Sequence, residues 1–322
     1  MKIGILGTGL IAQTVAPTIA EVNETECYAV ASRTYEKAEE FAKRFGFEKA
    51  YGSYEELYED PDVDMIYVAT PHSLHFENMM DAIKHKKAVL CEKAFTVNAA
   101  QAREIAKAAK KNNVFAAEAI WPRYMPSRKI IRDTIESGII GKPSILTANL
   151  SYIIYMNKRI MDPALAGGAL LDVGVYGLNF ALMHFGDDIE RIDTSVRMTD
   201  TGVDGLESIT LFYNDGRMAV LTHGIYARSD RKGIIYGDKG YIVVENINNP
   251  KDLSVFDTED NLIKHIDFPK QFSGYEYEFR ECAEAAASGR IECDSMPLVD
   301  SIRVMEVMDA VRNKWGLKYP IE

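Results

Sequence analysis

The feature that most constrains the fold is a glycine motif near the start of the chain. Residues 3–6 form a short apolar run, and the sequence Gly7-Thr8-Gly9-Leu10-Ile11-Ala12 follows directly, with a helical pattern after it. Between a strand and a helix, this G-x-G-x-x-A spacing permits a tight turn and lets a pyrophosphate approach the amino end of the helix. We therefore predict a dinucleotide site at Gly7, Thr8, Gly9, Leu10 and Ile11; the alternative is a glycine turn without a ligand.

Apolar runs recur along the first 120 residues and alternate with helical patterns. The runs are unbroken, as in strands that are covered on both faces, and they span residues 3–6, 27–31, 65–69, 88–91 and 114–117. Capping residues mark the helices between them, with Thr34 and Gly46 at the two ends of one helix and Ser53 at the start of the next. The alternation predicts an α/β protein whose residues 1–120 form a Rossmann domain with a doubly wound parallel sheet.

The pattern changes over residues 121–322. Mixed polar and apolar alternation surrounds two tight turns, at residues 214–216 and 237–240, and helical patterns cover residues 168–185 and 298–315. We predict a C-terminal α+β domain for substrate binding and oligomerisation, with a largely antiparallel open sheet. Its strand 209–213 has apolar residues on both faces, which favours a second subunit over the open face and therefore a homodimer or a larger homo-oligomer.

Composition excludes several classes of partner. The 322 residues include 37 Lys and Arg against 48 Asp and Glu, a net charge of −11, so the basic surface needed by nucleic acids or anionic membranes is not expected. The four cysteines lack CxxC spacing and predict free thiols in the cytoplasm. A strand pattern from residue 2 leaves no room for a signal peptide, and we expect no apolar stretch of membrane-spanning length.

The end of the second strand favours one cofactor. An NAD enzyme places a carboxylate there to bind the ribose hydroxyls, whereas this chain has Ser32-Arg33-Thr34, with Lys37 one turn later. A hydroxyl, two cations and a helix amino end suit a 2′-phosphate. Ser32, Arg33 and Lys37 therefore predict NADP, with NAD as the alternative.

Polar residues also follow two later strands. Because ligands bind at the carboxyl ends of parallel strands, we predict cofactor contacts from two groups of residues after the fourth and fifth strands and from two residues at the domain junction. They are Thr70, Pro71, His72 and His75; Glu92 and Lys93; and Trp121 and Arg123. His72 and His75 are three apart, but no carboxylate or cysteine completes a ligand set, so we predict no metal.

Five segments resemble the glucose–fructose oxidoreductase/inositol dehydrogenase (Gfo/Idh/MocA) family, and within it the branch of dimeric dihydrodiol dehydrogenases. They span nearly the whole chain and comprise residues 50–57, 90–93, 118–121, 167–172 and 201–204. The resemblance implies NADP-dependent hydride transfer at a secondary alcohol or carbonyl of a sugar, polyol or trans-dihydrodiol. It also implies a dimer.

The resemblance further implies that Lys93, Asp172 and Tyr176 are catalytic. Tyr176 would give or take a proton with help from the positive charge of Lys93, while Asp172 would orient the substrate hydroxyl or balance the lysine charge. Asp172 and Tyr176 are four apart, on one face of the expected helix. The family usually has a proline after its Glu-Lys pair, where this chain has Ala94.

Two other functions stay open at this stage. One is the NAD-dependent glycosidase or lyase chemistry of the same family, in which the hydride leaves and returns without net redox change. The other is a non-catalytic NADPH sensor that binds a partner protein. The presence of Lys93, Asp172 and Tyr176 together favours an enzyme over a sensor.

Overall fold

The computed structural model describes residues 1–322 and divides into two compact units. The first unit contains residues 1–124 and 271–305, and the second contains residues 125–270 and 306–322. The return of residues 271–305 to the first unit was not anticipated, because packing between distant segments leaves no local signal in a sequence.

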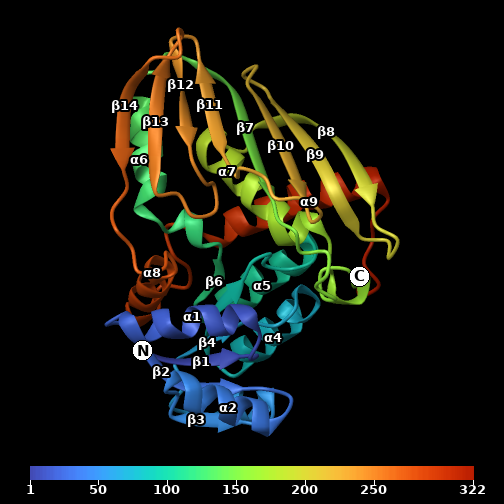
Figure 1. Ribbon diagram of the computed structural model, residues 1–322. Coiled ribbons are helices and arrows are strands. Elements are labelled where there is room, and N and C mark those ends of the chain that lie inside the picture. Colours follow the sequence, from blue (N-terminus) through green and yellow to red (C-terminus); the bar gives the residue numbers. More distant parts are fainter. The chain divides into compact units, whose positions relative to one another are not determined.

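The first unit is built on a six-stranded parallel sheet in the order β3-β2-β1-β4-β5-β6 (Figure 1). Its strands are β1 (Lys2–Leu6), β2 (Glu26–Ala31), β3 (Lys49–Tyr51), β4 (Met65–Val68), β5 (Ala88–Glu92) and β6 (Ala116–Ala119). This order is that of a doubly wound Rossmann sheet, so the predicted fold class is confirmed for this part. Strand β3 escaped prediction because its three half-buried residues form no apolar run.

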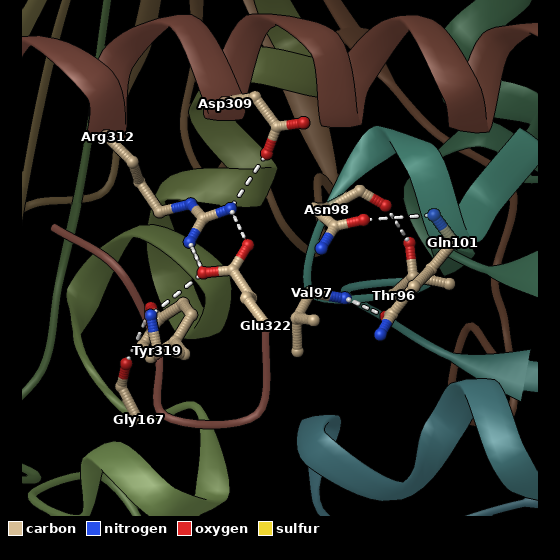
Figure 2. A network of polar contacts seen from close by, with 9 residues as sticks. All are labelled: Thr96, Val97, Asn98, Gln101, Gly167, Asp309, Arg312, Tyr319 and Glu322. Carbon is tan, nitrogen blue, oxygen red and sulfur yellow. Dashed lines mark hydrogen bonds and ion pairs between the residues drawn. The ribbon is translucent and has the colours of Figure 1, made fainter.

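The helices of the first unit differ at their amino ends, where two of them have a side-chain cap and the helix after Thr34 has none. They are α1 (Leu10–Glu21), α2 (Tyr35–Phe45), α3 (Tyr54–Glu59), α4 (His72–Lys84), α5 (Ala99–Asn112), the short η1 (Trp121–Arg123), α8 (Glu276–Ala287) and the first part of α9 (Leu298–Trp315). The Ser53 side chain accepts a hydrogen bond from the Glu56 N–H, and the Asn98 side chain accepts one from the Gln101 N–H at 2.9 Å (Figure 2). Gly46 ends α2 with a φ of 76°, as its sequence position predicts.

The second unit contains an eight-stranded sheet in the order β14-β13-β12-β11-β7-β10-β9-β8 (Figure 1). Its strands are β7 (Pro143–Ser151), β8 (Ile189–Met198), β9 (Asp204–Tyr213), β10 (Met218–Gly224), β11 (Gly233–Gly237), β12 (Gly240–Val244), β13 (Asp252–Asp257) and β14 (Leu262–Asp267). Only β7 and β10 pair in parallel, which confirms the largely antiparallel open sheet.

Helices pack on one face of this sheet. The second unit contains α6 (Pro126–Glu136), the short η2 (Pro163–Leu165), the π-helix η3 (Leu170–Gly174), α7 (Val175–Phe185) and the end of α9. Helix α7 packs against β7 and β10 (Figure 1).

One expectation about this region is wrong. By length and composition, the helical stretch Pro163–Phe185 is long and apolar enough to cross a membrane. Most of it is buried inside the protein, and core helices have the same composition because they are covered on nearly all sides.

Candidate functional site

The glycine motif forms an open cradle between β1 and α1. Gly7 has a φ of +104°, which L-residues rarely adopt, and a β-carbon there would lie 3.0 Å from the Ala69 carbonyl oxygen. Its N–H donates to the Ala31 carbonyl at 2.9 Å, which fixes the turn. A β-carbon at Gly9, the residue before α1, would meet nothing within 4 Å. The amino end of α1 therefore faces open space, as phosphate binding requires.

A cavity of about 770 Å³ opens at this cradle, within the first unit. It is lined by eight of the predicted cofactor contacts, namely Gly7, Thr8, Gly9, Ser32, Arg33, Lys37, Thr70 and Pro71. The remaining predicted contacts do not line it; they are Leu10, Ile11, His72, His75, Glu92, Lys93, Trp121 and Arg123. The structure thus brings together the phosphate motif and the end of β2.

Positive charge gathers in this cavity although the whole chain is acidic. Arg33 and Lys37 are exposed and form no ion pair. Arg44 lines the same cavity, and its guanidinium donates to the Gln13 side chain at 3.2 Å. Glu40 is the single acidic residue among the lining side chains. We did not predict Arg44, although its spacing of seven from Lys37 puts both on one helix face.

Lys93 directly follows β5 and is half-buried. The buried Glu92 before it accepts hydrogen bonds from the Tyr67 hydroxyl and from the Lys93 backbone N–H, the latter at 3.2 Å. Burial, together with the neighbouring Glu92 carboxylate, raises the pKa of Tyr67 well above its usual value, so the phenol remains a donor. The Lys93–Ala94 peptide bond is cis.

The two histidines after β4 are buried in the first unit. Both ring nitrogens of His75 lie 2.9 Å from backbone oxygens, Nδ1 from Ala94 and Nε2 from Thr70. The His72 ring packs edge-on against His75, with centroids 5.5 Å apart. Because protein oxygens engage both nitrogens, His75 braces the turn after Lys93.

The residues predicted at the domain junction make packing contacts inside the first unit. The Trp121 ring stacks on Tyr275, with centroids 4.3 Å apart and planes at 11°. The buried Arg123 guanidinium donates to an Asp300 carboxylate oxygen at 2.5 Å. Both contacts tie η1 to the returning segment 271–305.

Asp172 and Tyr176 lie in the second unit. Asp172 is on the π-helix η3, and its carboxylate, with 12% of the side chain exposed, forms an ion pair with Arg159 at 2.8 Å. Tyr176 is a buried residue in the first turn of α7. Their spacing crosses the junction between π- and α-helix, a local feature often found at functional sites. Arg159 was missed because no motif connects it with Asp172.

Fold and cavity together define a class, the Rossmann-fold dinucleotide-binding proteins. Two family models match the chain, "Oxidoreductase family, NAD-binding Rossmann fold" over residues 1–119 and "GFO/IDH/MocA C-terminal domain" over residues 129–243. The chain therefore belongs to the GFO/IDH/MocA family of oxidoreductases, as its motifs indicated.

Several relatives align with this chain over nearly the whole length of both proteins. A trans-1,2-dihydrobenzene-1,2-diol dehydrogenase of Xenopus laevis is 36% identical to this chain, and that of Homo sapiens is 32% identical. Each alignment covers 99% of this chain and at least 98% of the relative. A 3-ketoreductase from Actinomadura kijaniata, solved with NADP and TDP-benzene, superposes with a TM-score of 0.91 at 26% identity and 97% coverage of both chains. An aldose–aldose oxidoreductase from Caulobacter crescentus, at 21% identity, 98% coverage of both chains and a TM-score of 0.88, supports the fold alone.

Proposed function

We propose that the chain transfers a hydride between NADP and a secondary alcohol or its carbonyl, with a trans-dihydrodiol as the first candidate substrate and a sugar as the second. The preference for NADP rests on Arg33 and Lys37, two cations that have no ion-pair partner and lie beside Ser32 in the nucleotide cavity. The relatives named for dihydrodiol oxidation support the first substrate, and the resemblance to the glucose–fructose oxidoreductase/inositol dehydrogenase family implies the second.

The cofactor, when bound, supplies or accepts the hydride. The backbone at Gly7 and Gly9 leaves room for its pyrophosphate at the start of α1, and Arg33 and Lys37 offer charge to a 2′-phosphate. A β-carbon at Gly9 would meet nothing within 4 Å, so these residues leave space for the group at the start of α1.

The protein's own task is to move one proton and to orient one carbon. We assign the proton to Tyr176, with the Lys93 ammonium stabilising negative charge that develops on oxygen. Asp172, held by Arg159, would orient the substrate hydroxyl. Lys93 belongs to the first unit, whereas Asp172 and Tyr176 belong to the second.

A substrate panel tests this function. The protein is assayed with trans-dihydrodiols, aldoses, polyols, inositols and 2-oxo compounds, with NADP and with NAD, by nicotinamide absorbance. We expect NADP-dependent turnover of a dihydrodiol or a sugar. Product formation without a net absorbance change would instead indicate the glycosidase or lyase chemistry. Tight NADPH binding without turnover of any compound would indicate a sensor.

We also propose a homodimer through the open face of the eight-stranded sheet. Ile235 is buried on the face that carries α7, whereas three aromatic rings, Tyr236, Tyr241 and Phe256, lie half-buried on the opposite face. They are cross-strand neighbours, with centroid separations of 5.7 and 5.0 Å. Such apolar area favours a covering partner. Sedimentation should show a dimer or larger species that Tyr241→Glu weakens; a 36.1 kDa monomer at micromolar concentration would contradict this.

A cytoplasmic location is the last part of the proposal. All four cysteines are free thiols, and three of them are buried, which suits a reducing compartment. Cell fractionation with compartment markers tests it, and recovery of the protein with an oxidising compartment would contradict it.

A further inference from the structure

Three ionisable side chains are buried together in the second unit without a cationic partner. Asp204 is 0% exposed, and the side chains of Glu207 and His223 are also 0% exposed. No lysine or arginine forms an ion pair with either carboxyl group. Burying ionisable groups without a cation to compensate them costs folding free energy, so we expect these three side chains to have a function.

Strand geometry brings the three side chains to one face. The pairing of β8 with β9 skips Gly205, since Arg197 pairs with Leu206 and Met198 with Asp204. This bulge turns Asp204 to the face of the sheet on which Glu207 lies, because a bulge shifts the alternation of side chains by one residue. His223 is the cross-strand neighbour of Glu207, and its Nδ1 lies 2.7 Å from the Glu207 Oε1.

This buried cluster, defined as Asp204, Glu207 and His223, supports the helix that carries Asp172 and Tyr176. The Asp204 Oδ2 accepts a hydrogen bond from the backbone N–H of Leu170, the first residue of η3, at 2.6 Å. Glycines make the close approach possible: a β-carbon at Gly168, Gly174 or Gly177 would lie 2.1, 2.4 or 2.1 Å from a polar atom of Asp204, Glu207 or His223, respectively.

The two carboxyl groups of the cluster need protons. Oδ1 of Asp204 and Oε2 of Glu207 are buried and receive no hydrogen bond, although the two carboxyl groups interact directly. Burial, together with the neighbouring Glu207, raises the pKa of Asp204 to about 8, and burial raises the pKa of Glu207 to about 8. Burial also lowers the pKa of His223 to about 3, so its imidazole is neutral. At neutral pH both carboxyl groups are therefore mostly protonated, and as an interacting pair they lose their protons as the pH rises through about 8.

One more titratable group faces the cluster, from the segment after α9. The buried Tyr319 hydroxyl donates to the Gly167 carbonyl at 2.9 Å (Figure 2), and burial, with Asp204 nearby, raises the pKa of Tyr319 well above its usual value. Tyr319 is anchored by its own backbone N–H, which donates to Glu322. The η3 and α7 elements present backbone and glycine to the cluster, so the carboxyl groups of Asp204 and Glu207 are the part that titrates, near pH 8.

We propose that Asp204, Glu207 and His223 are positioning residues, which hold the π-turn Leu170–Gly174, and with it Asp172 and Tyr176, in place while the two carboxyl groups stay protonated. Loss of their protons leaves two carboxylates side by side in a buried site, and their repulsion loosens the contact with Leu170. The catalytic consequence rests on the proposed function, whereas the positioning of the turn does not.

Hydrogen–deuterium exchange of the segment 168–177 tests the positioning without any substrate. In the wild type, exchange corrected for its intrinsic rate should rise between about pH 6.5 and about pH 9.5, as Asp204 and Glu207 lose their protons. Asp204→Ala should raise it about tenfold or more at every pH, because a buried N–H loses its acceptor. Asp204→Asn and Glu207→Gln retain the shape but leave a single carboxyl group with no second carboxylate to repel it, so the rise with pH should be much smaller in both.

A matched control is Asp60→Asn, which changes another buried carboxylate, one that accepts hydrogen bonds from Lys49 and Tyr51 in the first unit. It should leave exchange of the segment 168–177 unchanged. The proposal is overturned if Asp204→Ala exchanges like the wild type, or if Asp204→Asn and Glu207→Gln retain the wild-type pH dependence.

Kinetics then separate the proposal from the proposed function. If a substrate is found, Asp204→Ala should lower kcat about tenfold or more with an NADPH Kd within about twofold of the wild type, because the cluster acts on the helix and not on the nucleotide cavity. The alkaline fall in kcat should also be much smaller in Glu207→Gln. An unchanged kcat in Asp204→Ala would refute the catalytic part. If the wild type turns over nothing, the proposed function fails, while the exchange result still decides the positioning.

Discussion

The sharpest test of the cofactor assignment is Arg33→Ala, measured by nucleotide binding. Arg33 lies exposed at the rim of the cavity and forms no ion pair, so its charge is available to a 2′-phosphate. A hydrogen bond to a charged group contributes about 1.5–3 kcal/mol, and solvent screening of an exposed arginine argues for the lower end. About 1.4 kcal/mol corresponds to a tenfold change in Kd, so we expect about tenfold weaker binding.

Calorimetry with 2′,5′-ADP and 5′-AMP isolates this contribution, since the two ligands differ only by the 2′-phosphate. Arg33→Ala should weaken binding of 2′,5′-ADP about tenfold and leave that of 5′-AMP nearly unchanged. The control is Lys43→Ala, which removes a cation from α2, the helix that follows Arg33; Lys43 pairs with Glu39 at 2.9 Å and does not line the cavity. The difference between ligands should also shrink with added salt. Equal losses for both ligands would refute the assignment.

Three further outcomes are expected. Tyr176→Phe should lower kcat about 10²- to 10⁴-fold with little change in NADPH affinity, and Lys93→Met should lower kcat at least as much. In steady-state assays, the loss of kcat in the double variant should be smaller than the product of the two single losses. The free energy of unfolding should fall as pH rises from about 6.5 to about 8.5, because Asp204 and Glu207 have raised pKa values and the folded state holds protons that the unfolded state has released; denaturant titrations at several pH values check this, and a rise would contradict it. Gly177→Ala should destabilise the protein by about 1–3 kcal/mol despite its better helix propensity, because the new β-carbon would lie 2.1 Å from a ring nitrogen of the buried cluster. A melting temperature at or above that of the wild type would contradict this prediction, because it would show that the buried cluster shifts to make room for the β-carbon.

Short-range patterns explain what the sequence could predict. The turn after β1 and the cations at the end of β2 are set by residues within one strand–turn–helix unit, so their spacing identifies them. Gly7 and Arg33 accordingly line one cavity. The closing helix Leu298–Trp315 has the predicted bounds for the same reason, because its pattern is continuous.

Contacts between residues that are far apart in the sequence explain what the sequence could not predict. Asp172 was a candidate from its motif, but its ion pair with Arg159 joins a helix to a loop that shares no periodicity with it. His75 was expected to contact the cofactor, yet its two nitrogens meet backbone oxygens, one of them nineteen residues away. Such pairings arise from packing, and a single sequence contains no measure of the distance between residues that are far apart along it.

Glycine shows the same limit, because one residue type serves two opposite purposes in this chain. A β-carbon at Gly9 would meet nothing within 4 Å, whereas one at Gly177 would lie 2.1 Å from the His223 Nε2. The first glycine keeps a surface open for a ligand, and the second lets a helix rest on polar side chains of its own protein. Substitutions should therefore separate the two: a side chain at Gly9 acts on nucleotide binding, and one at Gly177 acts on the position of the turn before Tyr176.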